Sequence, residues 1–258
     1  MTNGVVPERL QTEASYRLIK RAIISCALAP GQQVTEEYLA ERFGTGRGAV
    51  RSALKRLYQE QFVQTISRQR YVIPPVTLRE ARELFDIRLL LEPVAARRAA
   101  GTIEPDTVAR LRELCESHYD LGDAHSAGDF LAANTEFHVT VARASGSAML
   151  ADLISNLLDR VERLNHLSHA LLDRNVAAHD EHVALVDALE AGDGVRAERV
   201  MADQIGTAFS FVLEALTMSP SIQSASVTAP ISRSVRAMSA GFPATREAQK
   251  VRIPGSDE

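Results

Sequence analysis

A fixed spacing of small residues within positions 36–57 constrains this chain more than any other feature. Ala40, Gly44 and Val50 occupy the fifth, ninth and fifteenth positions of a helix-turn-helix unit. The small Ala40 lets two helices approach each other, and Gly44 can take up a left-handed turn without steric strain. Val50 then packs the second helix against the first. The spacing predicts two short helices that meet at a tight turn.

Local signals around this unit define its limits. Thr35 is a suitable N-cap for the first helix, which should end near Gly44, and residues 47–59 have the apolar period of the second helix. The β-prone runs 62–66 and 71–73 flank a polar segment, which predicts a hairpin. Pro74-Pro75 follows this hairpin and indicates a stiff linker.

Charge divides the chain of 258 residues into two unlike parts. Residues 1–76 carry 11 Arg and Lys against 6 Asp and Glu, whereas residues 77–218 carry 13 against 24. This asymmetry favours different partners for the two parts. Within the basic part, Arg47 and Arg51 lie one turn apart at the start of the second helix and share a face. Their guanidinium groups can bond guanine O6 and N7 together, or grip a phosphate.

The helix-turn-helix spacing predicts contact with double-stranded DNA. The second helix would lie in the major groove, and the hairpin would act as a wing that reaches the backbone or the minor groove. A helix pair that merely packs, with solvated arginines, is the structural alternative. The expected DNA-binding residues are Thr35, Arg47, Gly48, Arg51, Arg68 and Arg70.

Every segment after the linker has the apolar period of a helix. Thr77 and Glu80 form a capping box that opens the first of these helices. Helices are predicted over 77–100, 105–125, 129–144, 148–172, 176–191 and from the Gly192-Asp193 turn to about Leu216.

These elements give a mainly α fold in two domains. A winged helix-turn-helix domain is expected over 11–76, with a first helix over 11–28, and an all-α bundle of six or seven helices over 77–218. Residues 1–10 are expected to be flexible. The Ser-, Ala- and Pro-rich residues 219–258 are expected to be disordered.

Two sets of segments resemble known families. LAPGQQVTEEYLAERFGTGRGAVRSALKRLYQEQFV resembles the winged helix-turn-helix of GntR-type transcription regulators. LFDIRLLLEPVAARRAA, NTEFHVTVARASG and EHVALVDALEAGD resemble the ligand-sensing FCD domain of the fatty-acid-responsive, FadR-type subfamily. The resemblance covers residues 11–217 and implies DNA contacts at Arg47 and Arg51. Gly46 and Gly48 stand where the family commonly has hydroxyl residues, so an altered operator preference is expected.

The FCD resemblance also implies a site in the bundle. The family's metal site uses an Asp, a His four residues later and two further His. This chain keeps His138 and His182 but has Asn134 and Gln204 at the other two positions. Two readings follow: a weakened divalent-metal site (Zn, Ni or Mn) at His138 and His182, or a polar pocket that binds the effector directly. The second is favoured, because an amide is a weak neutral ligand for a metal ion.

The effector-binding residues are therefore expected to be Arg88, Asn134, His138, His182 and Gln204. Arg88 could pair with a carboxylate of the effector, or it could form a structural ion pair with an acid of the bundle. Neither alternative is excluded by the sequence.

Together these features predict a DNA-binding transcription regulator that is not an enzyme. It would be a homodimer, a repressor rather than an activator, and responsive to a small carboxylate. Two cysteines and the lack of a long apolar run favour a cytoplasmic protein without a membrane span. The alternatives are a helical metal hydrolase using His138 and His182 with an attached DNA-binding domain, and a DNA-binding architectural protein without an effector.

Overall fold

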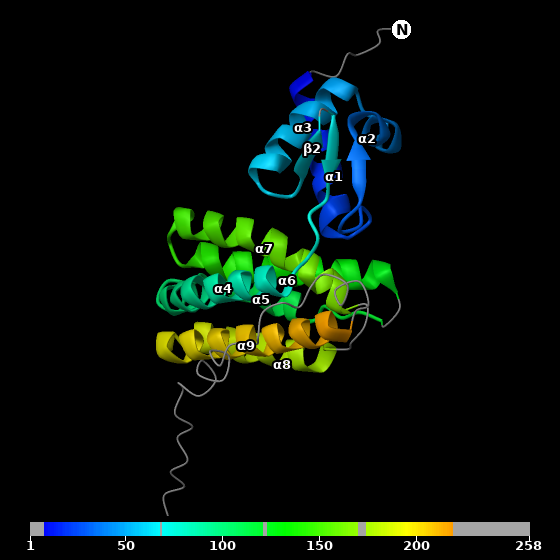
Figure 1. Cartoon of the computed structure of the whole chain (residues 1–258). Helices are drawn as coiled ribbons and strands as arrows, with labels where there is room; N and C mark the ends of the chain where they lie inside the picture. Colours follow the sequence, from blue (N-terminus) through cyan, green and yellow to red (C-terminus); the bar gives the residue numbers. More distant parts are fainter. Residues whose placement is uncertain (1–7, 68, 121–122, 170–173, 219–258) are drawn as a thin grey trace, which may run out of the picture.

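The protein is described here by a computed structural model that covers residues 8–67, 69–120, 123–169 and 174–218. Arg68, most of the expected flexible N-terminus and the whole expected tail lie outside these residues. The first helix, α1 (Glu8–Ile24), begins three residues earlier and ends four residues earlier than the sequence predicts. Figure 1 shows a small N-terminal unit that sits on one side of a helical bundle.

The N-terminal unit contains the helix-turn-helix and its wing. Its remaining elements are β1 (Gln33–Thr35), α2 (Glu36–Phe43), α3 (Arg47–Gln59), β2 (Gln64–Ser67) and β3 (Arg70–Val72). The strands form an antiparallel sheet in the order β1-β3-β2. The sequence predicted the β2–β3 hairpin but missed β1. This strand of three residues joins the sheet because the backbone of Gln32 and Gly31 bonds that of Ile73 after the Pro30-Gly31 turn.

The turn between α2 and α3 has the predicted chemistry. Gly44 adopts φ 61°, in the left-handed region, and its N–H bonds the carbonyls of Ala40 and Glu41. Thr35 Oγ1 accepts a hydrogen bond from Tyr38 N at 3.1 Å and so caps α2. Val50 is fully buried against α1 and α2. The predicted helix limits at Thr35 and Gly44 are confirmed.

The described part of the second unit is all helical, as predicted. Its six helices are α4 (Leu78–Ala99), α5 (Pro105–Cys115), α6 (Ala124–Ala144), α7 (Ala148–His169), α8 (Asn175–Glu190) and α9 (Gly194–Met218). The core lies around α4, which packs along α9 and also contacts α6 and α7. Within the described ranges, no helix has the length and apolar character needed to cross a membrane.

Two predicted helix limits in the bundle are wrong. The helix expected over 105–125 ends at Cys115, and α6 begins five residues before the expected start. The intervening loop is held by tertiary contacts, because Tyr119 N donates to Asn175 Oδ1 at 2.9 Å and Asn175 Nδ2 donates to Tyr119 O at 2.8 Å. Asp123 then caps α6 by accepting from His125 N at 2.9 Å. The sequence pattern does not contain these long-range contacts.

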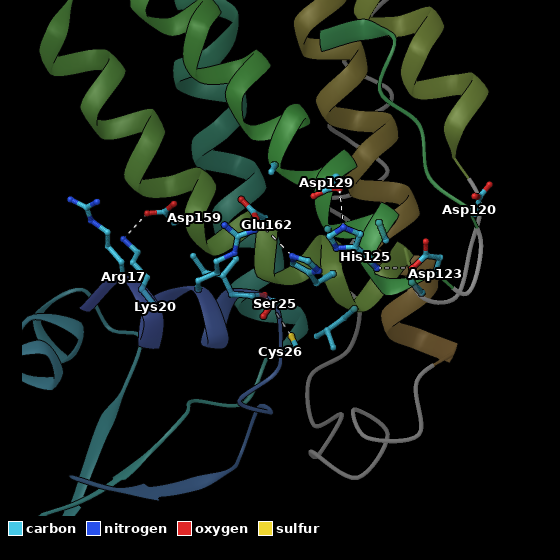
Figure 2. Close-up of a pocket in the computed structure, with 18 of the residues that line it drawn as sticks. Arg17, Lys20, Ser25, Cys26, Asp120, Asp123, His125, Asp129, Asp159 and Glu162 are labelled. Carbon is cyan, nitrogen blue, oxygen red and sulfur yellow. Dashed lines mark hydrogen bonds and ion pairs between the residues drawn. The ribbon is translucent and has the colours of Figure 1, made fainter. Parts of the chain in front are cut away.

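Helix α7 joins the two units. Lys20 Nζ on α1 lies 2.6 Å from Asp159 Oδ2 on α7, and the dashed line in Figure 2 marks this ion pair. The next residue on α7, Arg160, donates to Gln61 Oε1 at 3.0 Å and to Glu80 Oε1 at 2.7 Å. Arg163, one turn later, donates to the carbonyl of Pro74 in the linker. The N-terminal unit is therefore attached by side chains as well as by the linker.

The N-cap of α4 can be tested directly by substitution. Thr77 Oγ1 accepts from Glu80 N at 3.1 Å, which confirms Thr77 as the N-cap, whereas the Glu80 carboxylate accepts from Arg160. Replacing Thr77 by Ala should destabilise the bundle by about 1 kcal/mol and lower its melting temperature by about 2–4 °C. Thr77→Ser is the matched control, since it keeps the hydroxyl. Equal melting temperatures for the Ala variant and wild type in calorimetry would contradict the assignment.

Candidate nucleic-acid interface and ligand pocket

Helix α3 presents one apolar and one polar face. Its inner face is buried and made of Ala49, Val50, Ala53, Leu54 and Leu57. Arg47, Gly48 and Arg51 lie on the exposed face at its N-terminal end. A Cβ added at Gly48 would meet no atom within 4 Å, so this face is open. The structure thus places the predicted major-groove residues together.

Both arginines are paired with the first turn of α2, which the sequence reasoning missed. Arg51 Nε donates to both carboxylate oxygens of Glu36, at 3.1 and 3.0 Å. Arg51 Nη2 donates to Glu36 Oε2 at 2.8 Å. Arg47 Nη2 contacts Glu37 Oε1. Acidic residues in the first turn of a helix are stabilised by its dipole. Their proximity to α3 could not be predicted without the angle between the two helices.

Arg56 belongs to the opposite side of α3. Its guanidinium carbon lies 3.6 Å from the ring centroid of Tyr16, and it pairs with Glu13 at 3.1 Å and Glu60 at 3.0 Å. These contacts attach α3 to α1. Arg56 therefore contributes to the basic charge of the segment but does not lie on the exposed face with Arg47 and Arg51.

The wing carries one further described candidate. Arg70 is exposed on β3, in register with Thr35 of β1 and Ser67 of β2. Gln69 supplies the left-handed residue of the turn, with φ 65°. Thr35 lies beside this strand, but its hydroxyl already caps α2. Thr35 and Arg70 are thus on the same edge of the unit, whereas Arg68 is not described.

The polar residues predicted in the bundle lie around a buried ion pair. Arg88 Nε lies 2.5 Å from Glu92 Oε1, and both side chains are buried. His138 Nδ1 lies 2.7 Å from Glu92 Oε2, and His138 Nε2 lies 3.5 Å from Arg88 Nη2. Arg88 thus forms the structural ion pair that was one of its two readings. The sequence reasoning did not single out Glu92, although it lies four residues after Arg88 on the same face of α4.

These contacts determine the charge of the cluster. Burial opposes ionisation of Glu92, but Arg88 and His138 outweigh it and lower the pKa of Glu92 to about 2. Burial lowers the pKa of His138 despite the nearby carboxylate. The pKa of His182 is lowered further, by burial and by the positive charges of Arg174 and Arg88. Near neutral pH the cluster thus holds a charged Arg–Glu pair beside two neutral imidazoles.

A small cavity lies next to this cluster. It encloses about 20 Å³, which is room for one water molecule. Its lining includes four of the predicted residues, Arg88, Asn134, His138 and Gln204. Asn165 and Arg174 also line it. His182 is not in the lining, because its ring packs on Phe137 at a centroid distance of 4.1 Å. Arg174 and Asn165 are lining residues that sequence reasoning missed.

Apart from His138 Nδ1, which lies beside Glu92, two buried polar atoms in this region have no hydrogen-bond partner in the described structure. They are Gln204 Oε1 and His182 Nε2. An unpaired buried polar atom costs about 1–3 kcal/mol, so such atoms indicate that a water or a ligand group satisfies them. They lie in the part of the bundle where the effector was expected.

The residues that line the cavity offer few ligands for a divalent metal ion. The Nε2 of His138 faces the guanidinium of Arg88 and its Nδ1 faces Glu92, so neither nitrogen is directed at a free position. Asn134 and Gln204 offer only neutral amides. A cation placed between them would meet the positive charge of Arg88 and Arg174 without a carboxylate ligand of its own. The residues suit an anion better than a cation.

A larger cleft separates α1 from the bundle. Its volume is about 1190 Å³, and Figure 2 shows its basic wall on α1 facing an acidic wall on the bundle. Arg17 and Lys20 lie on the α1 side near Asp159, whereas Asp129 lies beside His125 at the other end of the cleft. Lys20 is the residue that bridges the two walls in the contacts described above. The cleft is therefore part of the junction between the two units.

Comparisons with known proteins agree with both halves of this description. The model of the bacterial regulatory proteins of the gntR family matches residues 11–73, and the FCD domain model matches residues 83–207. The HTH-type transcriptional repressor RspR of Escherichia coli K12 is 24% identical over 199 residues, which is 77% of this chain and 87% of that protein. The HTH-type transcriptional regulator McbR of the same strain is 29% identical over 180 residues, 68% of this chain and 80% of its own length.

Solved structures share the fold. The structure of E. coli McbR/YncC matches with a TM-score of 0.68 at 24% identity, covering 79% of this chain and 97% of that one. A transcriptional regulator GntR from Rhodococcus sp. RHA1 matches with a TM-score of 0.62 at 20% identity, covering 79% and 98%. With a winged helix-turn-helix followed by an all-helical FCD domain, the chain belongs to the GntR family of bacterial regulatory proteins.

Proposed function

We propose that the protein is a homodimeric transcription regulator, a repressor, that releases its operator when a small carboxylate enters the bundle. The observation that carries the proposal is the exposed N-terminal turn of α3, where Arg47 and Arg51 lie together on a rigid helix. Repression is supported by relatives that are named repressors. Action on DNA places such a regulator in the cytoplasm of a bacterium.

Binding rather than catalysis is favoured by the bundle site. A hydrolase would need a metal or a nucleophile open to substrate, but His138 is held between Arg88 and Glu92. The adjacent cavity has room for a single water molecule. An architectural protein without an effector would have no need for the unpaired Gln204 Oε1 beside two guanidinium groups.

The polar groups of this pocket can bond a small carboxylate. Arg88 is neutralised by Glu92, and Arg174 Nη2 lies 2.5 Å from Glu181 Oε2 at the pocket rim. Both guanidinium groups have further donors, and the amides of Asn134 and Gln204 can bond the polar groups of an acid. Because the cavity is small, a carboxylate can enter only if the surrounding helices move. Ligand binding would therefore favour a different packing of the bundle.

Helix α7 connects the residues around the cavity to the DNA-binding unit. Asn165 lines the cavity, and Arg163, two residues earlier, bonds the linker at Pro74. Asp159 and Arg160, about one turn before Arg163, hold α1 and the end of α3. A shift of α7 would thus change the position of α3, and we propose this route in addition to the linker itself.

A dimer is supported by an unpartnered apolar stripe on α4. Ile87, Leu90 and Val94 share one face and are 43%, 71% and 45% exposed. A second copy related by a two-fold axis could cover this stripe. Two copies would also present two recognition helices to the two half-sites of an operator.

The DNA contacts predict a specific loss of binding. Arg51→Ala should weaken the binding of an operator duplex, selected by the wild-type protein from a random library, by about 1–3 kcal/mol if it reads a base. Adding Arg47→Ala should weaken it further and reduce the dependence on salt concentration. Fluorescence anisotropy at fixed salt measures both. Arg196→Ala, an exposed arginine at the start of α9, is the charge-matched control. Wild-type affinity in the correctly folded double variant would refute the assignment.

The proposed ligand pocket predicts that one variant becomes more stable but binds carboxylates more weakly. Gln204→Leu removes a buried acceptor that has no partner, so it should raise the melting temperature of the ligand-free protein. It should also weaken the stabilisation by short-chain carboxylates in a thermal-shift screen whose negative controls are the corresponding amides. Gln64→Leu, at an exposed position of β2, serves as control. An undiminished carboxylate shift in Gln204→Leu would place the sensor elsewhere.

The apolar stripe predicts an effect on assembly. Leu90→Glu places a charge in the centre of the stripe, so it should convert the dimer into a monomer in light scattering coupled to size-exclusion chromatography. Val195→Glu changes a similarly exposed apolar residue on α9 and should leave the dimer intact. A dimer unaffected by Leu90→Glu, or a monomeric wild type at micromolar concentration, would show that α4 is not the interface.

A further inference from the structure

We propose that two neighbouring glutamates of α2 control DNA binding by α3 in different ways: Glu36 positions Arg51 for base reading, and Glu37 competes with DNA for Arg47. The proposal rests on the proposed function, since it assumes that α3 enters the major groove. It adds a positioning residue and an internal competitor that lie outside α3.

The side chain of Glu36 is buried in the N-terminal unit. It is 7% exposed, whereas the side chain of Arg51 is 58% exposed. Glu36 is the first residue of α2, directly after its N-cap, so the helix dipole stabilises the carboxylate there. Tyr71 of β3 faces the same group: burial raises the pKa of Tyr71, and the charge of Glu36 raises it further. The carboxylate therefore lies where α2, α3 and the wing meet.

The form of the Arg51–Glu36 contact leaves one edge of the guanidinium open. Glu36 binds Nε and Nη2, which form one side of the planar fork. The other edge, made of Nη1 and the second hydrogen of Nη2, is not engaged by Glu36. Two parallel donors on one edge are what guanine O6 and N7 require. Holding the first edge fixes the plane of the second, so less side-chain entropy is lost when a base is bound.

The Arg47–Glu37 contact has a different character. It joins a single guanidinium nitrogen to a single oxygen, and the two side chains are 66% and 69% exposed. Exposed pairs of this kind contribute little to stability. Arg47 can therefore exchange Glu37 for a phosphate. The carboxylate left behind repels the DNA backbone, which weakens binding to any sequence.

The two glutamates are adjacent and carry the same charge, so they provide a matched pair of variants. Glu36→Gln and Glu37→Gln each remove one negative charge without changing size. The probes are the operator duplex selected from a random library by the wild-type protein, a scrambled duplex of equal length, and operator duplexes with single base-pair changes. Anisotropy at fixed salt gives the affinities, and circular dichroism and melting temperature verify the fold.

Glu36→Gln should weaken operator binding roughly tenfold while leaving the scrambled duplex bound equally or more tightly. The penalty for changing the base pair read by Arg51 should shrink, while penalties at other base pairs persist. Glu37→Gln should instead tighten binding to operator and scrambled duplex by the same factor. In an Arg51→Lys background, which keeps the charge but not the fork, Glu36→Gln should have no further effect on base discrimination.

Three results would overturn the proposal. The first is an equal loss for operator and scrambled duplex in Glu36→Gln, since this would indicate a purely structural role. The second is full base discrimination in Glu36→Gln. The third is a further loss of discrimination in the Arg51→Lys background. If the wild-type protein enriches no sequence at all from the library, the proposed function itself fails, and this result is distinct from the other three.

Discussion

The ion pair between Lys20 and Asp159 is a partly buried contact between the two units of the protein. Lys20 Nζ lies 2.6 Å from Asp159 of α7 and 3.0 Å from Glu60 of its own unit. Burial alone would lower the pKa of Lys20, but hydrogen bonds to Asp159, Tyr16 and Glu60 raise it instead, so the ammonium keeps its charge. A partly buried charge that loses one of its partners is destabilised. The pair therefore favours one placement of α1 on α7 over others.

Helix α7 connects this placement to the buried cavity. One face of the helix carries the contacts to α1, the end of α3 and the linker, while Asn165 near its C-terminal end lines the buried cavity. A ligand that enlarges the cavity changes the packing of the same helix that holds the DNA-binding unit. Coupling between two sites requires an element whose arrangement both sites influence, and we propose α7 as that element. In this account the Pro74-Pro75 linker limits the range of movement, whereas α7 selects the position.

Local signals were sufficient for the helix-turn-helix. Gly44 could be placed because a left-handed turn favours glycine, and Thr35 because an N-cap needs a hydroxyl acceptor. The limits of α3 and the number of bundle helices followed from apolar periodicity. Strand β1 was missed because three residues carry no usable period, and its pairing with β3 spans the whole unit. The limits of α5 and α6 depend on Tyr119 and Asn175, which lie far apart in the sequence.

The sites were less accessible to sequence reasoning. The pocket residues were found through the family resemblance, but Glu92 and Arg174 became apparent only when the helices were packed. The same holds for Glu36, whose contact with Arg51 depends on the crossing of α2 and α3. Arg56 illustrates the reverse case. Its charge adds to the basic character of the segment, but its contacts with Tyr16, Glu13 and Glu60 attach α3 to α1.

The most direct test of the coupling is the operator affinity of wild type and Asp159→Asn, each with and without the carboxylate that most stabilises the wild-type protein. Asp159→Asn removes the charge that holds Lys20 but leaves the pocket residues unchanged. We expect the carboxylate to weaken operator binding severalfold in wild type and much less in the variant, and to raise the melting temperature of both. The same loss of operator affinity in both proteins would contradict a role for α7 and would leave the linker as the route between the two sites.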